Sequence, residues 1–284
     1  MCKLSGVSRS GYYNWKRSES SRNRREIQDR DDFELILNAY NYRGYAKGAR
    51  GIYMRLLHQG IRMNLKKIRR LMKKFGLFCP IRKANPYRRM AKAIRTNAVA
   101  DNRLNREFRK HGPRKVLLTD ITYIPYQKKF CYLSVVKDAF TEEVLSYVLS
   151  ESLELDFVLE TMEQLIKDHA VAFETDIMIH SDQGCHYTSV KFRQLLADHK
   201  IRQSMSRRGN CWDNAPQESF FGHMKDELSI KQKGWSVYDD VKQDIDDWMD
   251  YYNHDRGQWN LGKLTPSEFY NYIKTGINPL SMIN

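Results

Sequence analysis

Hydrophobic positions in the front part of the chain recur with the period of an α-helix. Apolar residues three and four positions apart predict a short helix over DFELILNAY (32–40). A second apolar run, IYMRLLHQG (52–60), ends at a glycine, the residue type that commonly closes helices. A third segment follows Asn64, a favourable N-cap, with its apolar side chains on one stripe: Leu65, Ile68, Leu71, Met72 and Phe75. Helices separated by such a short turn predict a helix-turn-helix.

The last of these helices is strongly basic. Lys66, Lys67, Arg69 and Arg70 fill the faces beside the apolar stripe, which makes them candidate DNA-binding residues that would contact phosphates. The alternative is an ordinary helical hairpin with a solvated basic face. We therefore expect a basic N-terminal segment over residues 1–31 and a small all-α, helix-turn-helix DNA-binding region over residues 32–78.

A basic segment follows at residues 79–114. It has three prolines, poor apolar periodicity and almost only positive charge. We interpret it as a linker or arm that lies along a nucleic-acid backbone. The domain boundary is placed near 113–115, and a second domain is expected over residues 115–275.

The pattern changes at Val116, where short runs rich in apolar and β-branched residues begin. Three of them, VLLTDITYI, FCYLSVVKDAF and EEVLSYVLS, predict an antiparallel meander. Helical periodicity follows over 152–169, and the remaining segments alternate strand and helix: 176–184, 188–199, 201–205, 213–228 and 237–253. This order predicts an α/β domain with a mixed five-stranded sheet and matches the ribonuclease-H-like fold.

Charge separates the same two parts of the chain. The 284 residues carry a formal net charge of +14 and have a sequence pI near 9.5. Residues 1–114 hold 30 Lys and Arg against 8 Asp and Glu (net +22), whereas residues 115–284 hold 18 against 26 (net −8). A basic front half joined to an acidic back half indicates a polyanion-binding region attached to a domain with another task.

Composition also excludes several classes of protein. No window approaches the roughly 18 consecutive apolar residues of a membrane-spanning helix, and the first residues lack the apolar region of a secretory signal. The five cysteines form no CxxC motif, which favours reduced thiols. We therefore expect a cytoplasmic, nucleoid-associated protein with no membrane partner.

Three acids in the second half are candidate metal ligands. Asp120 interrupts an apolar strand, Asp182 follows the strand at 176–181, and Glu218 lies on a helix away from its apolar seam. Taken singly, they also fit a buried acceptor, a turn residue and a solvated helix charge. Together, two acids from strands and one from a helix suit a pair of Mg²⁺ ions about 3.5–4 Å apart, the arrangement that activates a nucleophile for phosphodiester chemistry.

Several motifs resemble one family. TDITYI (119–124), HSDQGCHYTS (180–189) and SMSRRGNCWDNAPQESFFGHMKDEL (204–228) resemble the DDE integrase core of bacterial insertion-sequence transposases of family three, the IS150-like group, second-frame product. The 35 residues between Asp182 and Glu218 match that family's D,D,35,E spacing. Residues 251–270 resemble its C-terminal signature, and residues 32–87 its helix-turn-helix region.

The resemblance implies a DNA transposase, a polynucleotidyl transferase that cleaves and transfers strands at the element's ends. It implies that Asp120, Asp182 and Glu218 bind two Mg²⁺ ions, with Mn²⁺ as an alternative. Further DNA contacts are implied or suggested at Lys225, Arg207, Arg208, Asn210 and Asn214, the arginines and Asn210 having a loop-stabilising role as their alternative. The partners implied are the terminal inverted repeats, target DNA and further copies of the chain in a synaptic complex.

The sequence departs from the family pattern at two places. Leu117 stands where a tryptophan is common, and Cys185-His186 stands where a small residue and glutamine are commoner. For His186, DNA binding or tuning of the site competes with a simple loop position. The first residues resemble the junction at which the family's second reading frame begins, so an upstream-frame product or its fusion is a further expected partner.

Two other functions remain open at this point. The chain could be a non-catalytic DNA-binding modulator of a frameshift-fused transposase, or a nuclease on the same fold. The intact set of three acids favours chemistry over the first, and the helix-turn-helix with its basic arm favours end recognition over the second.

Overall fold

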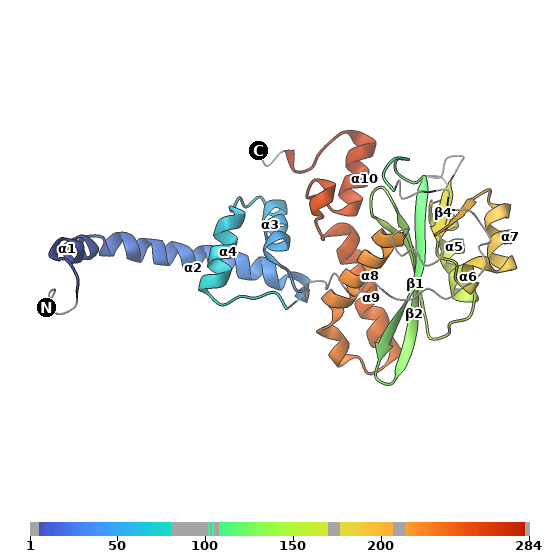
Figure 1. The fold of residues 1–284 in the computed structure, drawn as a ribbon, viewed down its shortest axis with the longest axis horizontal. Helices are drawn as coiled ribbons and strands as arrows, with labels where there is room; N and C mark the ends of the chain where they lie inside the picture. Colours follow the sequence, from blue (N-terminus) through green and yellow to red (C-terminus); the bar gives the residue numbers. More distant parts are fainter. Residues whose placement is uncertain are drawn as a thin grey trace. The chain divides into compact units, whose positions relative to one another are not determined.

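The computed structural model describes residues 6–80, 102, 104, 108–169, 177–206 and 214–281 (Figure 1). The described residues fall into two compact units, one ending at Pro80 and the other containing the β-sheet. Within the described ranges, every helix is too short or too polar to span a lipid bilayer.

The first unit is all helical. It comprises α1 (Arg9–Arg17), α2 (Glu19–Asn41), the short 3-10 helix η1 (Tyr42–Gly44), α3 (Ala49–His58) and α4 (Leu65–Lys74). Its core gathers apolar residues from the last three α-helices, including Ile36, Ile52, Leu56, Ile68 and Leu71. The structure confirms the Asn64 cap, because its side chain accepts a hydrogen bond from the Lys66 N–H at 2.8 Å.

Helix α2 is longer than the hydrophobic pattern predicts. The sequence predicts a helix from Asp32 onward, whereas α2 begins at Glu19 and runs for 23 residues. Its first half is charged and solvent-exposed, with Ile27 as a lone exposed apolar residue, so it has no apolar stripe to detect. The prediction that the helix is short was therefore wrong.

The second unit contains one five-stranded sheet in the order β3-β2-β1-β4-β5. Its strands are β1 (Val116–Tyr126), β2 (Lys129–Asp138), β3 (Val144–Ser150), β4 (Met178–Ser181) and β5 (Arg202–Met205). The pairs β1–β2 and β2–β3 are antiparallel, whereas β1–β4 and β4–β5 are parallel. This mixed sheet with its helices confirms the predicted ribonuclease-H-like fold.

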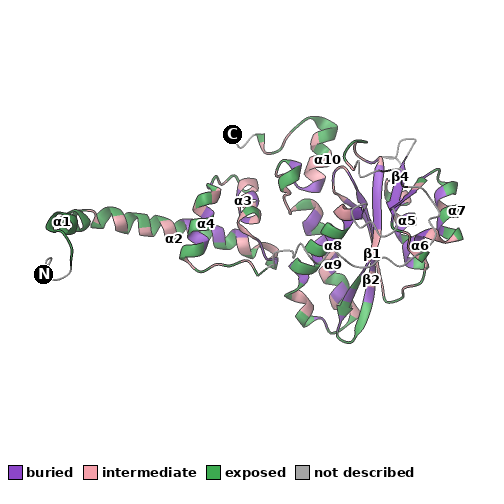
Figure 2. Cartoon of the chain, viewed as in Figure 1, coloured by how far each residue is buried: buried purple, intermediate pink, exposed green. Residues whose placement is uncertain are grey.

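Helices cover both faces of the sheet (Figure 1). One core cluster joins Leu117 of β1 to Phe157 and Met162 of α5 (Asp156–His169) and to Phe192 of α7 (Val190–Asp198), which follows α6 (Cys185–Thr188). On the opposite face lie α8 (Ala215–Leu228) and α9 (Tyr238–His254), with η5 (Lys231–Gly234) between them. Buried residues follow the strands and the inner sides of these helices (Figure 2).

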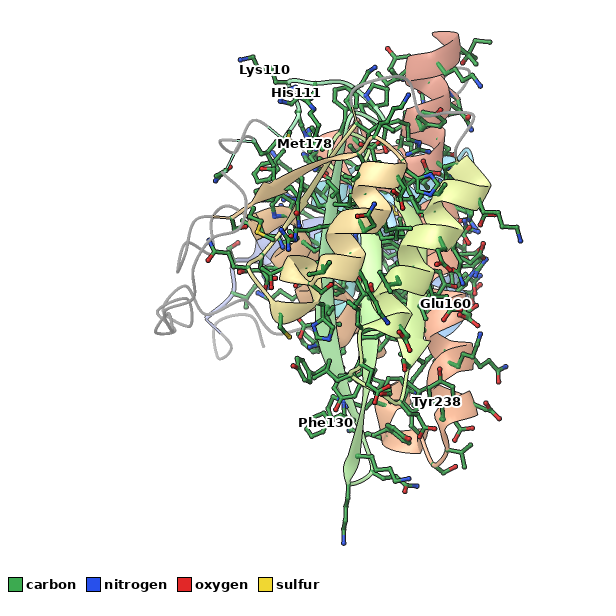
Figure 3. The ribbon with its side chains drawn as sticks, turned by 90° about the vertical axis from the view of Figure 1, so that its right-hand side faces the viewer. Lys110, His111, Phe130, Glu160, Met178 and Tyr238 are labelled. Carbon is green, nitrogen blue, oxygen red and sulfur yellow. The ribbon has the colours of Figure 1, made fainter. Side chains whose placement is uncertain are left out.

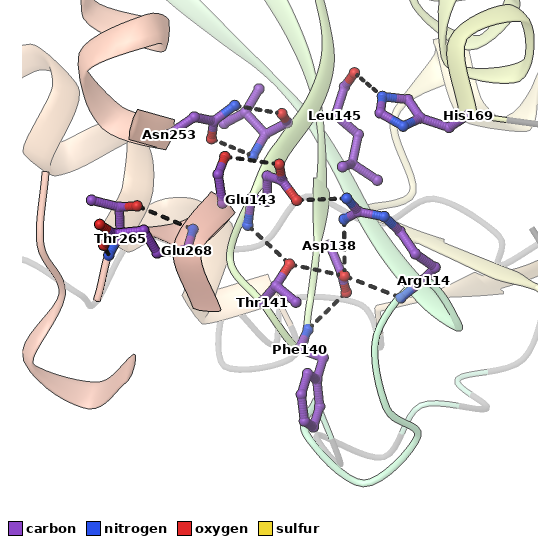
Figure 4. A network of polar contacts seen from close by, with 12 residues as sticks. Arg114, Asp138, Phe140, Thr141, Glu143, Leu145, His169, Asn253, Thr265 and Glu268 are labelled. Atoms are coloured by element: carbon purple, nitrogen blue, oxygen red, sulfur yellow. Dashed lines mark hydrogen bonds and ion pairs between the residues drawn. The ribbon is translucent and has the colours of Figure 1, made fainter. Parts of the chain in front are cut away.

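The two ends of the sheet differ. The β1–β2 hairpin extends past the other strands and places Phe130 near its tip, while Met178 lies towards the opposite end (Figure 3). At the start of β1, Arg114 pairs with the buried Asp138 at 3.2 Å, and Asp138 also accepts the Thr141 hydroxyl at 2.9 Å (Figure 4). Through Glu143 and Ser267 this network reaches α10 (Pro266–Thr275), which follows η6 (Trp259–Leu261). The C-terminal helices are thus tied to the β2–β3 turn.

Candidate active site

Asp120 lies in the middle of β1, opposite Val135 of β2. Both of its carboxylate oxygens accept hydrogen bonds. Oδ1 accepts the backbone N–H of Ile121 at 2.8 Å, and Oδ2 accepts the side-chain amide of Asn214 at 3.3 Å. Because Asn214 lies directly before α8, this second bond links the central strand to the start of that helix.

The surroundings of Asp120 favour its protonated form. Burial and then the charge of Asp182 raise its pKa from 3.8 to about 8, with a smaller contribution from Glu218. The Ile121 N–H and the charge of Lys225 act in the opposite direction. Asp182 and Glu218 therefore lie close enough to Asp120 for their charges to act on its carboxyl.

Asp182 follows the last residue of β4 and is exposed. Its Oδ1 accepts the backbone N–H of Gly184 at 2.8 Å. A Cβ atom added to Gly184 would lie only 2.9 Å from that oxygen, so a larger residue there would displace the Asp182 carboxylate. Strand β4 runs parallel to β1 as its direct neighbour, and their pairing ends with His180 opposite Leu118. Asp182 and Asp120 each follow that last pair by two residues, on neighbouring chain segments.

Strand β4 is fixed to β5 by the residue two positions before Asp182. His180 is fully buried, and its ring nitrogens lie 2.9 Å from the Ser204 hydroxyl and 3.1 Å from the Ser206 hydroxyl. Gln183 adds a bond from its amide to the Ser206 carbonyl at 3.0 Å. Polar contacts with Ser204 and Ser206 therefore hold the chain both before and after Asp182.

Glu218 lies in the first turn of α8, where a negative charge is favourable beside the helix N-terminus. Its side chain is exposed, whereas Phe221, Met224 and Leu228 are buried along the other side of the helix. Lys225 is also exposed, two turns after Glu218. Although the residue is exposed, partial desolvation by its neighbours lowers the pKa of Lys225, and the charge of Asp120 opposes that shift.

Comparisons with known proteins match both units of the chain. An HTH-like domain model matches residues 26–85, and two integrase core domain models match residues 110–211 and 199–266. A 31 kDa protein of insertion element IS600 from Shigella sonnei is 30% identical over 95% of this chain and 97% of its own length. The putative transposase InsK of IS150 from Escherichia coli K12 is 34% identical, over 79% of this chain and 77% of that protein. The chain belongs to the IS3-like family of insertion-sequence transposases.

A solved structure supports the fold. One chain of the simian T-cell lymphotropic virus intasome in complex with the PP2A regulatory subunit B56 gamma matches with a TM-score of 0.50 at 16% identity. The match covers 86% of this chain and 77% of that chain. The resemblance of the motifs to IS3-like transposases is therefore confirmed at the level of family and fold.

The carboxylates of the three acids in this transposase are suitable ligands for a hard divalent cation. Asp120, Asp182 and Glu218 offer only carboxylate oxygens, the ligands that Mg²⁺ prefers, and a cation would relieve the repulsion that raises the Asp120 pKa. Within the described ranges, however, no three His, Cys, Asp or Glu side chains come close enough together to hold an ion. The carboxylates of Asp120 and Asp182 instead accept hydrogen bonds from the Asn214 amide and the Gly184 N–H.

The other DNA-binding candidates have different positions. Arg207, Arg208 and Asn210 lie outside the described residues. On α4, Lys67 pairs with Asp32 of α2. Arg70 donates two hydrogen bonds to the carboxylate of Asp29, at 2.7 and 2.8 Å. Lys66 and Arg69 are exposed. Two of the four basic residues predicted on this helix thus lie against acids of the same unit.

At Cys185-His186, where the sequence departs from the family pattern, the histidine makes structural contacts. The half-buried His186 lies with Nε2 2.7 Å from the Leu153 carbonyl, to which it donates, and its Nδ1 is 3.6 Å from the Cys185 sulfur. His186 therefore ties α6 to the segment before α5.

Sequence reasoning missed one residue beside this group of acids. Lys137 is a buried lysine of β2 that contacts the first turn of α8. The available signal was a basic residue at an inward position of an apolar strand, on the same face of the sheet as Asp120.

Proposed function

We propose that this IS3-like transposase cleaves DNA strands at insertion-sequence ends and joins them to new DNA. Asp120, Asp182 and Glu218 are the proposed ligands of two Mg²⁺ ions, and Mn²⁺ would fit the same oxygen donors. The observation that supports the proposal is the proximity of these acids, since the charges of Asp182 and Glu218 add to burial in raising the Asp120 pKa.

The residues around the acids have separate tasks in this proposal. Asn214 orients the Asp120 carboxylate, and the Gly184 N–H orients that of Asp182. Lys225, exposed on the same helix as Glu218, contacts a DNA phosphate. When bound, Mg²⁺ would activate water or a 3′-hydroxyl and stabilise the leaving oxygen.

DNA recognition is assigned to both units. In the first, the exposed cations of α4 contact backbone phosphates of the terminal inverted repeat. We also propose Arg207, Arg208 and Asn210 as contacts near the acids, and an assembly of several copies that holds two ends together. An upstream-frame product or its fusion is a further proposed partner. The proposed location is cytoplasmic and nucleoid-associated.

The experiment that tests the proposal uses the purified 284-residue chain and a labelled duplex carrying the flanking inverted repeat. Nicking and joining are scored with Mg²⁺ and with EDTA. Products that require Mg²⁺ support the proposal. Binding without products favours the non-catalytic modulator, and the fused upstream frame is then added. Cleavage of a random duplex at the same rate favours a general nuclease.

A further inference from the structure

Lys137 shares a face of the sheet with Asp120. In the β1–β2 register Lys137 pairs with Leu118, and Asp120 pairs with Val135. Alternate residues of a strand point to the same face, so Lys137 and Asp120 both point towards the α8 side. The Lys137 side chain is almost completely buried there, at 2% exposure.

The side chain of Lys137 contacts α8 on both sides of Glu218 in sequence. Its Nζ donates a hydrogen bond to the Pro216 carbonyl at 3.0 Å. The same Nζ lies 5.1 Å from the centre of the Phe220 ring, within the range of a cation–π interaction. Lys137 therefore fastens the first turn of α8, which carries Glu218, to the sheet, in addition to the Asn214–Asp120 bond at the N-cap.

The neighbouring inward residue provides no comparable tie. Gln217 is fully buried, and neither atom of its amide has a hydrogen-bond partner among the described residues. The far end of α8 is held separately, since Glu227 pairs with Arg256 at 2.9 Å and accepts the Trp248 N–H at 3.0 Å. The two ends of the helix thus have independent polar anchors.

Burying this lysine is costly to folding. Desolvation lowers the Lys137 pKa from 10.5 to about 8, although the charges of Asp138 and Glu142 act in the opposite direction. A methionine of similar length would fill the same space without that cost. The contact therefore favours a defined position of the first turn of α8 rather than overall stability.

We infer that Lys137 is a positioning residue that fixes the first turn of α8 and so sets the Glu218 carboxylate relative to Asp120. This inference rests on the proposed function for its effect on activity, but the anchoring itself does not require metal or DNA.

The test compares Lys137→Met with two controls in the full chain. Lys129→Met makes the same change at an exposed position of the same strand, and Arg256→Met removes the anchor at the other end of α8. Amide hydrogen exchange is measured over peptides covering residues 214–228 without metal. Thermal midpoints, binding of the end duplex and the Mg²⁺ concentration for half-maximal joining are measured for each variant.

For Lys137→Met we expect faster exchange in the first turn of α8 and unchanged DNA binding. Its thermal midpoint should stay the same or rise. The Mg²⁺ midpoint should increase about tenfold, the usual effect of removing a group that orients a metal ligand. Arg256→Met should instead lower the thermal midpoint and leave the Mg²⁺ midpoint unchanged, and Lys129→Met should resemble the wild type.

Two results would overturn the inference. Unchanged exchange in the first turn would show that Lys137 does not anchor it. Faster exchange with an unchanged Mg²⁺ midpoint, or an equal shift in Arg256→Met, would show that the anchor does not position Glu218. If the wild type joins no ends at all, the proposed function fails, while the exchange data still decide the anchoring.

Discussion

Asp120 obtains its environment from segments far apart in the sequence. The strand supplies its position, whereas Asn214, 94 residues later, donates the hydrogen bond to its second oxygen. Asp182 and Glu218 then make ionisation of this carboxyl unfavourable. The metal-free protein thus bears a cost at the position where a cation would bind, as is common at functional sites.

This cost predicts a pH-dependent effect of Asp120→Asn on metal-free stability. The Asp120 pKa is about 8 in the folded protein and near its ordinary 3.8 when unfolded, so the folded state binds the extra proton between these values. Stability from this group is therefore lost as pH rises through that window. In EDTA, the thermal midpoint of Asp120→Asn should exceed that of the wild type by a margin that grows up to about pH 8 and then levels. A margin independent of pH would contradict the prediction.

The motif spacing identified the three acids but not what holds them. Asn214 was predicted as a DNA contact, and its bond to Asp120 depends on how the start of α8 meets β1. Lys137 escaped notice for the same reason, because its contact with Pro216 joins residues that are 79 positions apart. Local patterns report which face a side chain takes, but not which distant backbone group lies opposite.

Helix α4 shows how one element separates two sets of cations. Lys67, Arg70 and Lys74 lie against the acids of α2, and the bonds from Arg70 and Lys74 hold the pKa of Asp29 well below its usual range. Lys66, Arg69 and Lys73 are exposed at positions i, i+3 and i+7, which share a helix face. The sequence could not reveal this division, since Glu26 and Asp29 lie in the part of α2 that has no apolar pattern to predict a helix.

Two sets of substitutions should therefore have different effects. The triple change Lys66→Ala, Arg69→Ala and Lys73→Ala should weaken binding to the end duplex and reduce the salt-dependence slope of log K by about 3. The matched change Lys67→Ala, Arg70→Ala and Lys74→Ala should mainly destabilise the first unit and lower its thermal midpoint slightly, because surface ion pairs contribute little to stability. Binding titrations at several salt concentrations and thermal melts measure both, and equal slopes for the two variants would contradict the assignment.

At the scale of the whole molecule, the proposed chemistry and the proposed DNA contacts of α4 lie in separate units. Each has its own hydrophobic core, and the net charge changes from +22 over residues 1–114 to −8 over residues 115–284. The hydrophobic periods and the charge change predicted this division. The buried Leu104 packs with Val116, Leu118 and Met178, which extends the core of the second unit to residues before the predicted boundary at 113–115.

A fragment of residues 101–284, which keeps Leu104, should fold and retain Mg²⁺-dependent nicking. It should lose the preference for the element end over a random duplex, because the helix-turn-helix unit proposed to recognise that end is absent. Nicking rates on the two duplexes, for the fragment and for the full chain, measure the preference. The fragment with Glu218→Gln is the control for chemistry, and an undiminished end preference in the fragment would place recognition in the second unit.

Asp120, Asp182 and Glu218 are proposed to hold the metal for DNA chemistry together. The most direct test of this proposal is single-turnover joining of a pre-nicked element end with Mg²⁺ by Asp120→Asn, Asp182→Asn and Glu218→Gln. The matched control is Asp226→Asn, which removes an exposed acid of α8 outside the proposed set. We predict that the first three variants bind the end but join none, while Asp226→Asn joins at the wild-type rate. Joining at the wild-type rate by any of the three would remove that acid from the proposed metal site.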